Sequence, residues 1–85
     1  MKEFTYTITD PEGIHARPAG ELVKLAAGFK SSIIMKKEEK SADIKRIFAL
    51  MALGVKKGQA VTLTISGEDE ETAAAAVEAF LREHL

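Results

Sequence analysis

The sequence predicts an α+β fold, a two-layer open-faced β-sandwich in which three helices cover one face of a four-stranded antiparallel sheet. Apolar residues alternate with polar ones in residues 3–8 and 61–66, and they recur at helical spacing in residues 16–27 and 73–81. The order of these elements is βαββαβα, and two right-handed helical crossovers on either side of a hairpin place every helix on one face. We expect the strands to lie in the order 1-4-2-3.

The first strand is predicted over residues 3–8, where aromatic and branched side chains alternate with polar ones. The turn sequence Asp-Pro-Glu-Gly at residues 10–13 ends this strand. A helix is predicted from Ala16 to about Ala27, and Pro18 is compatible with it only because this proline lies in the first turn. His15 is then expected at the N-cap of the helix.

The middle of the chain predicts a hairpin with strands at Ser32–Lys37 and Lys40–Asp43, followed by a short helix at about Arg46–Leu53. The last strand is expected at residues 61–66, where branched apolar residues alternate with Thr and Ser. Asp69 is then expected to cap a long helix that has acidic residues in its first turn and runs toward the end of the chain.

With 85 residues, the chain has room for one small domain, residues 1–85. Its 46% apolar and 29% charged residues are typical of globular domains, which excludes disordered and collagen-like chains. The absence of cysteine excludes disulfides, thiolate catalysis and cysteine-based zinc sites. Neither a signal-peptide stretch nor an apolar run long enough to span a bilayer occurs, so we expect a cytoplasmic protein without membrane insertion.

The charge pattern constrains the class of partner. A net charge of −1 argues against a general binder of nucleic acids, and the predicted strands lack the aromatic pairs that stack bases. Residues 15–57 nevertheless carry ten bases and four acids, for a net charge of +6, while residues 1–14 carry −2 and residues 58–85 carry −5. The middle segment either forms a basic surface for an acidic partner or is scattered over a solvated surface by folding.

The residues with the clearest chemical meaning are 13–20, Gly-Ile-His-Ala-Arg-Pro-Ala-Gly. An imidazole at a helix N-cap, here His15, stands above the free backbone N–H groups near Ala16 to Pro18, where the helix dipole favours an anion. Arg17 adds a guanidinium that can hold a phosphate through two hydrogen bonds. A neutral ring nitrogen can also attack phosphorus and carry the phosphoryl group covalently. The motif therefore predicts an anion site and leaves phosphate binding and phosphoryl transfer both open.

Residues 13–20 resemble the active-site signature of HPr, the family of histidine-containing phosphocarriers of the bacterial phosphoenolpyruvate:sugar phosphotransferase system. The resemblance covers the whole chain, since the length and the element order match the family. The strand at 40–42, the helix at 47–54 and the turn at 67–69 also fall where the family has them.

The resemblance implies a carrier of phosphoryl groups rather than an enzyme, with no cofactor. His15 would accept a phosphoryl group on Nδ1 from phosphorylated enzyme I and pass it to the enzyme IIA domain of a sugar permease. Arg17 and the amides of the first helical turn would stabilise the group while it is bound. The sequence itself is silent on oligomeric state, for which a monomer is the default expectation.

The short second helix is apolar on two faces. Leu50 and Leu53 share one stripe, whereas Ile47, Phe48 and Met51 share another, and a helix cannot bury both stripes against one sheet. We therefore expect the second stripe to be an exposed docking surface. The resemblance implies that enzyme I and enzyme IIA both dock there, beside a small residue and a basic rim at Gly20, Lys24, Lys45 and Arg46.

Two departures from the family bear on function. Many Gram-positive members carry a serine at position 46 that a kinase phosphorylates to form a corepressor, whereas this chain has Arg46, so we expect that branch to be absent. Glu12 stands where Asn or Ser is frequent in the family, and an acid there is mildly unfavourable for a phosphate.

His84, near the end of the last predicted helix, is expected only to interact with the C-terminal end of its helix dipole. A metal site built on the two histidines would need further ligands, and the sequence suggests none.

Two other functions fit the same residues. A regulatory protein-binding module of the same fold would use the exposed helix without carrying phosphate, although such a module has no need of an imidazole above an anion site. A phosphocarrier of the nitrogen branch of the phosphotransferase system fits as well as one of the sugar branch.

Overall fold

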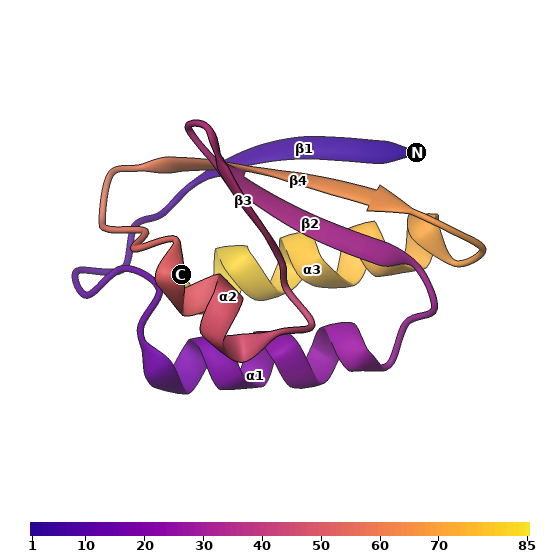
Figure 1. Cartoon of the computed structure of the whole chain (residues 1–85), viewed down its shortest axis with the longest axis horizontal. Helices are drawn as coiled ribbons and strands as arrows, with labels where there is room; N and C mark the ends of the chain where they lie inside the picture. Colours follow the sequence, from indigo (N-terminus) through magenta and orange to yellow (C-terminus); the bar gives the residue numbers. More distant parts are fainter.

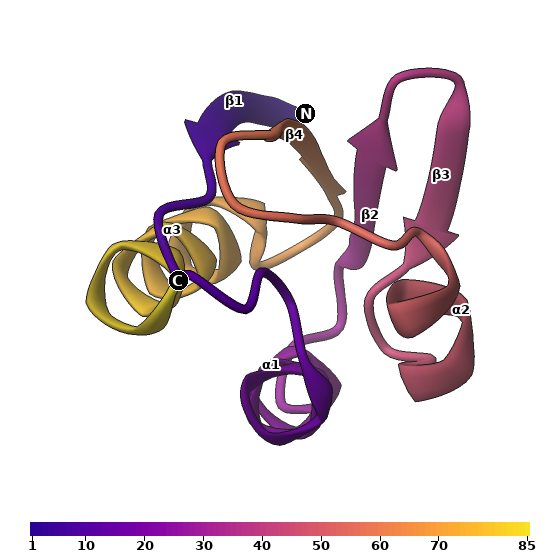
Figure 2. The ribbon, with the colours of Figure 1, turned by 90° about the vertical axis from the view of Figure 1, so that its left-hand side faces the viewer.

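The computed structural model describes residues 1–85 and contains four strands and three helices. These are β1 (Lys2–Thr7), α1 (Ala16–Ala27), β2 (Ser32–Lys37), β3 (Lys40–Asp43), α2 (Ile47–Ala52), β4 (Ala60–Ser66) and α3 (Glu70–His84). The sheet has the order β1-β4-β2-β3 with antiparallel neighbours throughout. Figures 1 and 2 show the three helices on the same side of the sheet, so the predicted α+β class and strand order are confirmed. None of the helices has the length and apolar character needed to cross a membrane.

The core lies between the sheet and the helices. In β4 the side chains of Val61, Leu63 and Ile65 are fully buried, and the Thr residues between them are only partly covered. From the helical side, Leu22 of α1 and Leu81 of α3 are also fully buried. The strand period of 2 and the helical period of 3.6 therefore direct their apolar residues into one shared layer.

The ends of three elements differ slightly from the sequence prediction. β1 spans Lys2–Thr7, so it begins and ends one residue earlier than the predicted strand at residues 3–8. α2 is one residue shorter at each end than the predicted Arg46–Leu53, since Arg46 is its N-cap and Leu53 its C-cap. β4 begins one residue early, at Ala60, which pairs with Thr7 of β1. These differences concern only the terminal residues of each element, where helix and strand ends are least determined by local sequence.

Asp69 has a different role from the one predicted. It occupies the N-cap position of α3, but its side chain makes no capping hydrogen bond to that helix. Its carboxylate instead accepts hydrogen bonds from the backbone N–H of Lys30 (2.9 Å), the backbone N–H of Ser31 (2.9 Å) and the hydroxyl of Ser31 (2.5 Å). Gly67, at φ +153°, lies so close that a Cβ on it would meet the Ser31 Cα at 2.6 Å. Asp69 thus joins the α1–β2 loop to the β4–α3 turn.

Asp69 should make part of the stability depend on pH. The hydrogen bond from the Ser31 hydroxyl, followed by the one from the Lys30 amide, lowers the pKa of Asp69 from 3.8 to about 2. A carboxylate with a depressed pKa stabilises the folded state fully above its unfolded-state pKa and loses that contribution as the pH falls through the folded-state pKa. In urea titrations, Asp69→Asn should therefore be less stable than the native chain at pH 7. The difference should shrink between about pH 4 and pH 2.

A matched control is Glu68→Gln, because the neighbouring Glu68 is exposed and pairs only with the Lys30 ammonium, at 3.6 Å. Such exposed pairs contribute little to stability. A stability difference for Asp69→Asn that stayed constant from pH 7 to pH 2 would contradict the role given to its carboxylate.

Candidate functional site

The loop between β1 and α1 forms a tight turn that is held by hydrogen bonds at its start, Asp10, and at its end, Ile14. The Asp10 carboxylate accepts the backbone N–H of Glu12 (2.8 Å), and its carbonyl accepts the N–H of Gly13 (2.9 Å). Gly13 has φ +69°, and a Cβ on it would lie 2.3 Å from the Val55 carbonyl oxygen. The next residue, Ile14, donates its N–H to that same oxygen at 3.1 Å. The loop is thereby fastened to the segment that follows α2, and only glycine fits at position 13.

This loop delivers His15 to the N-cap of α1, as predicted. The His15 backbone is extended (φ −102°, ψ 177°), its carbonyl accepts the N–H of Ala19 at 3.0 Å, and its side chain makes no capping bond. The N–H groups of Ala16 and Arg17 donate to no protein acceptor. Pro18 has no N–H to satisfy.

The first turn of α1 contains no acidic residue, whereas the first turn of α3 contains Glu70 and Glu71. The positive end of the α1 dipole is therefore not neutralised from within its own helix. Free amides and an uncompensated dipole are the features with which helix N-termini bind anions.

The His15 ring is 35% exposed and lines an open depression on the surface. Arg17 is exposed and forms no ion pair, which leaves its guanidinium available to an anion. The depression is lined by Asp10, His15, Arg17, Pro18, Glu21 and His84. His15, Arg17 and Pro18, singled out from the sequence, are thus brought together.

His84 is a residue of the depression that the sequence did not predict there. An interaction with the dipole of its own helix was expected for it, yet the end of α3 brings His84 to the same depression as His15. Its ring packs against Phe80 with a centroid distance of 4.6 Å. No local pattern could have shown this, because the two histidines are joined only by the tertiary fold.

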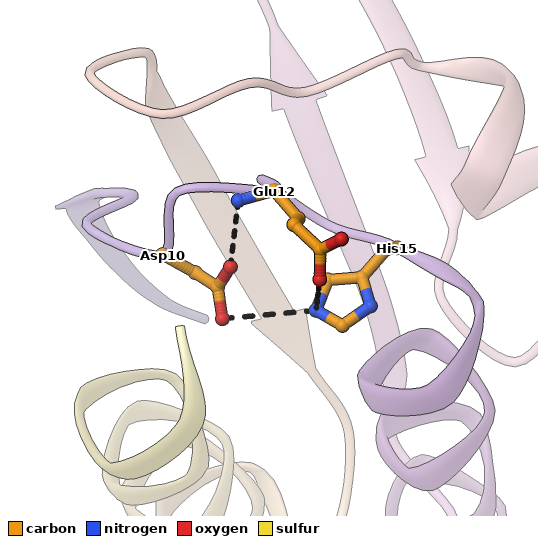
Figure 3. Close-up of side chains that lie close together, drawn as sticks. All are labelled: Asp10, Glu12 and His15. Carbon is orange, nitrogen blue, oxygen red and sulfur yellow. Dashed lines mark hydrogen bonds and ion pairs between the residues drawn. The ribbon is translucent and has the colours of Figure 1, made fainter.

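Two carboxylates lie beside one nitrogen of the His15 ring. Nε2 is 3.7 Å from the Asp10 Oδ2 and 3.7 Å from the Glu12 Oε2. Figure 3 shows both carboxylates on the same side of the ring, with the second ring nitrogen, Nδ1, turned away from Asp10. From the sequence, Asp10 was expected only in a turn and Glu12 was expected to be mildly unfavourable for a phosphate, and neither was expected to pair with the imidazole.

The apolar residues of α2 and its C-cap are partly buried and partly exposed, largely as predicted. Leu50 and Leu53 are buried, whereas Phe48 is 85% and Met51 39% exposed. Ile47 is half-buried, and its Cδ1 lies 3.9 Å from the position of a Cβ on Gly20. A Cβ at position 20 would therefore make only an ordinary van der Waals contact with Ile47. The large apolar side chains that α2 exposes are Phe48 and Met51.

The basic residues are not gathered around His15. The Lys45 ammonium donates a hydrogen bond to the carbonyl of Phe29 at 2.8 Å. Phe29 lies beyond the C-terminal end of α1, so Lys45 is at the opposite end of that helix from His15. Lys24 and Arg46 are exposed and free of ion pairs. The bases of the +6 segment are thus spread over α1, the β2–β3 hairpin and the segments on both sides of α2, and the groups nearest the imidazole are acids.

The chain is similar to known proteins over nearly its full length. Residues 2–83 match a family model described as the PTS HPr component phosphorylation site. The phosphocarrier protein HPr of Lysinibacillus sphaericus is 46% identical over 83 residues, which are 98% of this chain and 94% of that protein.

Solved structures show the same fold. An HPr structure from Thermoanaerobacter tengcongensis has a TM-score of 0.93 at 40% identity and covers 98% of this chain and 93% of its own. A crystal structure of Crh, described as a Bacillus subtilis catabolite-repression protein that forms a domain-swapped dimer, has a TM-score of 0.79 at 35% identity. That match covers 94% of this chain and 92% of the Crh chain.

Proposed function

Because the chain belongs to the HPr family of the phosphotransferase system, we propose that it carries phosphoryl groups on Nδ1 of His15, from phosphorylated enzyme I to the enzyme IIA domain of a sugar permease. The observation that carries this proposal is the position of the imidazole, half-exposed at the N-cap of α1 beside two unpaired amides and a free guanidinium. A pure binding module would not need a nucleophile at that place.

Each residue of the site has a separate role in the proposal. His15 provides the nitrogen that bonds to phosphorus, and the phosphorylated side chain gains about two negative charges. The N–H groups of Ala16 and Arg17 and the dipole of α1 stabilise that charge, and the Arg17 guanidinium adds charge-assisted hydrogen bonds. Pro18, at the third position of the helix, removes an N–H without cost and fixes the first turn.

The proposal is tested with the native chain, phosphoenolpyruvate and purified enzyme I. One phosphate per chain should appear in the intact mass, it should be lost in mild acid, and adding an enzyme IIA domain should discharge it. Incubation without enzyme I is the control. A native chain whose mass stays unchanged with several enzyme I homologues would refute the proposal.

We propose that the partners dock on Phe48 and Met51 of α2, with the adjoining small and basic residues Gly20, Lys24, Lys45, Arg46 and Ile47 at the edge of the contact. An exposed apolar pair next to unpaired cations suits partners that bring an apolar groove and acidic surroundings.

No cofactor or metal is needed for the proposed carrier role. We also propose a cytoplasmic, monomeric protein, since the partners are reached by free diffusion.

A regulatory binding module remains the second candidate, favoured by the likeness to Crh. The two functions differ in their need for the imidazole. If a His15→Gln variant retained all cellular activity of the chain, the regulatory function would replace the carrier function.

We further propose that the serine-kinase branch of regulation is absent. Position 46, at the N-cap of α2, is occupied by Arg46, which has no hydroxyl to modify. Incubation with such a kinase and labelled nucleotide should leave the chain unlabelled. Stoichiometric label on Ser41 or on any other serine would contradict this.

A further inference from the structure

We propose that Asp10 and Glu12 keep a proton on Nε2 of His15 throughout the phosphoryl cycle, so that Nδ1 serves first as the nucleophile and later as the leaving atom. This inference rests on the proposed carrier function and adds a role for two acids that the function itself does not require. Both are positioning residues, because they face the far nitrogen of the ring and act on Nδ1 only through the imidazole.

The geometry distinguishes the two ring nitrogens. Nε2 has two carboxylates at 3.7 Å, and the three polar atoms lie within 4.8 Å of one another. A neutral imidazole has one donor nitrogen and one acceptor nitrogen, and a carboxylate can only accept. The tautomer with the proton on Nε2 is therefore the one that the two acids favour. It leaves the lone pair on Nδ1, the nitrogen that Figure 3 shows turned away from Asp10.

Asp10 is fixed in this position by its own turn. Its Oδ1 accepts the N–H of Glu12 at 2.8 Å, and its Oδ2 faces the ring. One oxygen of the carboxylate therefore holds the turn while the other lies beside Nε2. Glu12 is 74% exposed and can move toward the ring when the ring becomes charged. The separation of 3.7 Å is that of an ion pair and allows this shortening.

Other ionisable groups around the ring do not compete for Nε2. Arg17 and Glu21 of α1 and His84 of α3 line the same depression, and Lys56 lies behind Gly13 in the α2–β4 segment. Glu21, the one acid among them, forms no ion pair with the imidazole, whereas Asp10 and Glu12 both do. Arg17 and Lys56 are cations without an acceptor atom, so they cannot accept a hydrogen bond from Nε2. The negative charge beside the ring is therefore concentrated at Nε2, and not at the nitrogen that would bond to phosphorus.

The charges balance in each step. In uptake, the Nδ1 lone pair forms the bond to phosphorus while the donor's bond to phosphorus breaks and its electron pair stays on the donor. The ring then carries a positive charge with its proton on Nε2, next to the two carboxylates. In transfer, the acceptor's nucleophilic side chain bonds to phosphorus, the bond from Nδ1 to phosphorus breaks, and its electron pair returns to Nδ1. The imidazole leaves as a neutral group, and the Nε2 proton never moves.

The test uses the full chain with the changes Asp10→Asn, Glu12→Gln and both together. Asparagine retains an Oδ1 acceptor for the Glu12 amide, and Glu12 is mostly exposed, so both variants should fold. The matched control is Glu21→Gln, which removes the same charge from the same depression without touching the ring nitrogen. All samples contain EDTA, and phosphoramidate serves as a small phosphoryl donor so that enzyme I is not required.

Two readouts decide the inference. In nitrogen-15 NMR spectra of the unphosphorylated chain, the fraction of His15 with its proton on Nδ1 should rise several-fold in the double variant and stay native in Glu21→Gln. In the phosphorylated chain, phosphate loss at pH 8 should be about tenfold slower in the double variant, because an opposite charge at this distance favours the protonated ring. The pH profile of that rate should move to lower pH.

A double variant with the native tautomer ratio and the native pH profile would overturn the inference. So would a native ring that carries its proton mainly on Nδ1. Failure of enzyme I to phosphorylate the native chain would count against the proposed function alone, since neither readout depends on enzyme I.

Discussion

Replacing His15 by alanine should abolish phosphoryl uptake from enzyme I. His15 is the only imidazole at the N-cap of α1, where the amides of Ala16 and Arg17 are free to hold the phosphoryl oxygens, whereas the other imidazole of the depression, His84, lies at the end of α3. The measurement is the intact mass of the chain after incubation with phosphoenolpyruvate and enzyme I. The phosphate signal should fall from one per chain to none.

The folded state should be almost unaffected by this change. The His15 side chain makes no hydrogen bond and is 35% exposed, so the free energy of unfolding should change by less than about 0.5 kcal/mol. His84→Ala is the control, since it removes the other imidazole of the depression and should retain one phosphate. Phosphate on the His15→Ala chain, or its loss from the His84→Ala chain, would move the carrier role away from His15.

Replacing Phe48 by alanine should weaken binding to enzyme I by about 10- to 100-fold. Phe48 is 85% exposed, which makes it the most exposed large apolar side chain of α2. Large aromatic side chains at the centre of a contact account for about 2 kcal/mol or more of binding free energy, and 1.4 kcal/mol is a factor of ten. The Michaelis constant for the chain as a substrate of enzyme I measures the effect, and the turnover number at saturation should change little.

Leu50→Ala provides the contrast on the same helix. Leu50 is 1% exposed, so its truncation should lower the free energy of unfolding by about 2–4 kcal/mol while the docking side chains remain. Phe48→Ala should show the reverse, with native stability and impaired docking. Unchanged Michaelis constants for Phe48→Ala with both enzyme I and an enzyme IIA domain would rule out α2 as the docking surface.

The fold could be predicted from local patterns because each element has a clear period. Alternation in residues 61–66 and helical spacing in residues 16–27 reflect burial on one side, which the structure confirms at Val61 and Leu22. The position of His15 followed from the same reasoning, since a helix that begins at Ala16 needs an N-cap one residue earlier. All of these features depend on residues that are close together in the sequence, and local patterns can therefore predict them.

The parts that could not be predicted depend on contacts between distant segments. Asp69 was expected to cap its own helix, as an aspartate at an N-cap usually does. It instead bonds to Ser31, 38 positions away, because the turn at Gly67 brings the two loops together. The approach of His84 to the depression and the attachment of Lys45 to Phe29 have the same origin.

The contacts of Gly13 and Ile14 with Val55 have a consequence for the proposed carrier function. Through them, the loop that bears His15 is attached directly to the segment that follows α2, the helix that bears Phe48. Under the proposed function, a phosphate donor and a phosphate acceptor of unrelated shape would therefore meet the same spacing between Phe48 and the reactive ring nitrogen. Each would have to place its own reactive group at that spacing from the groove that receives Phe48.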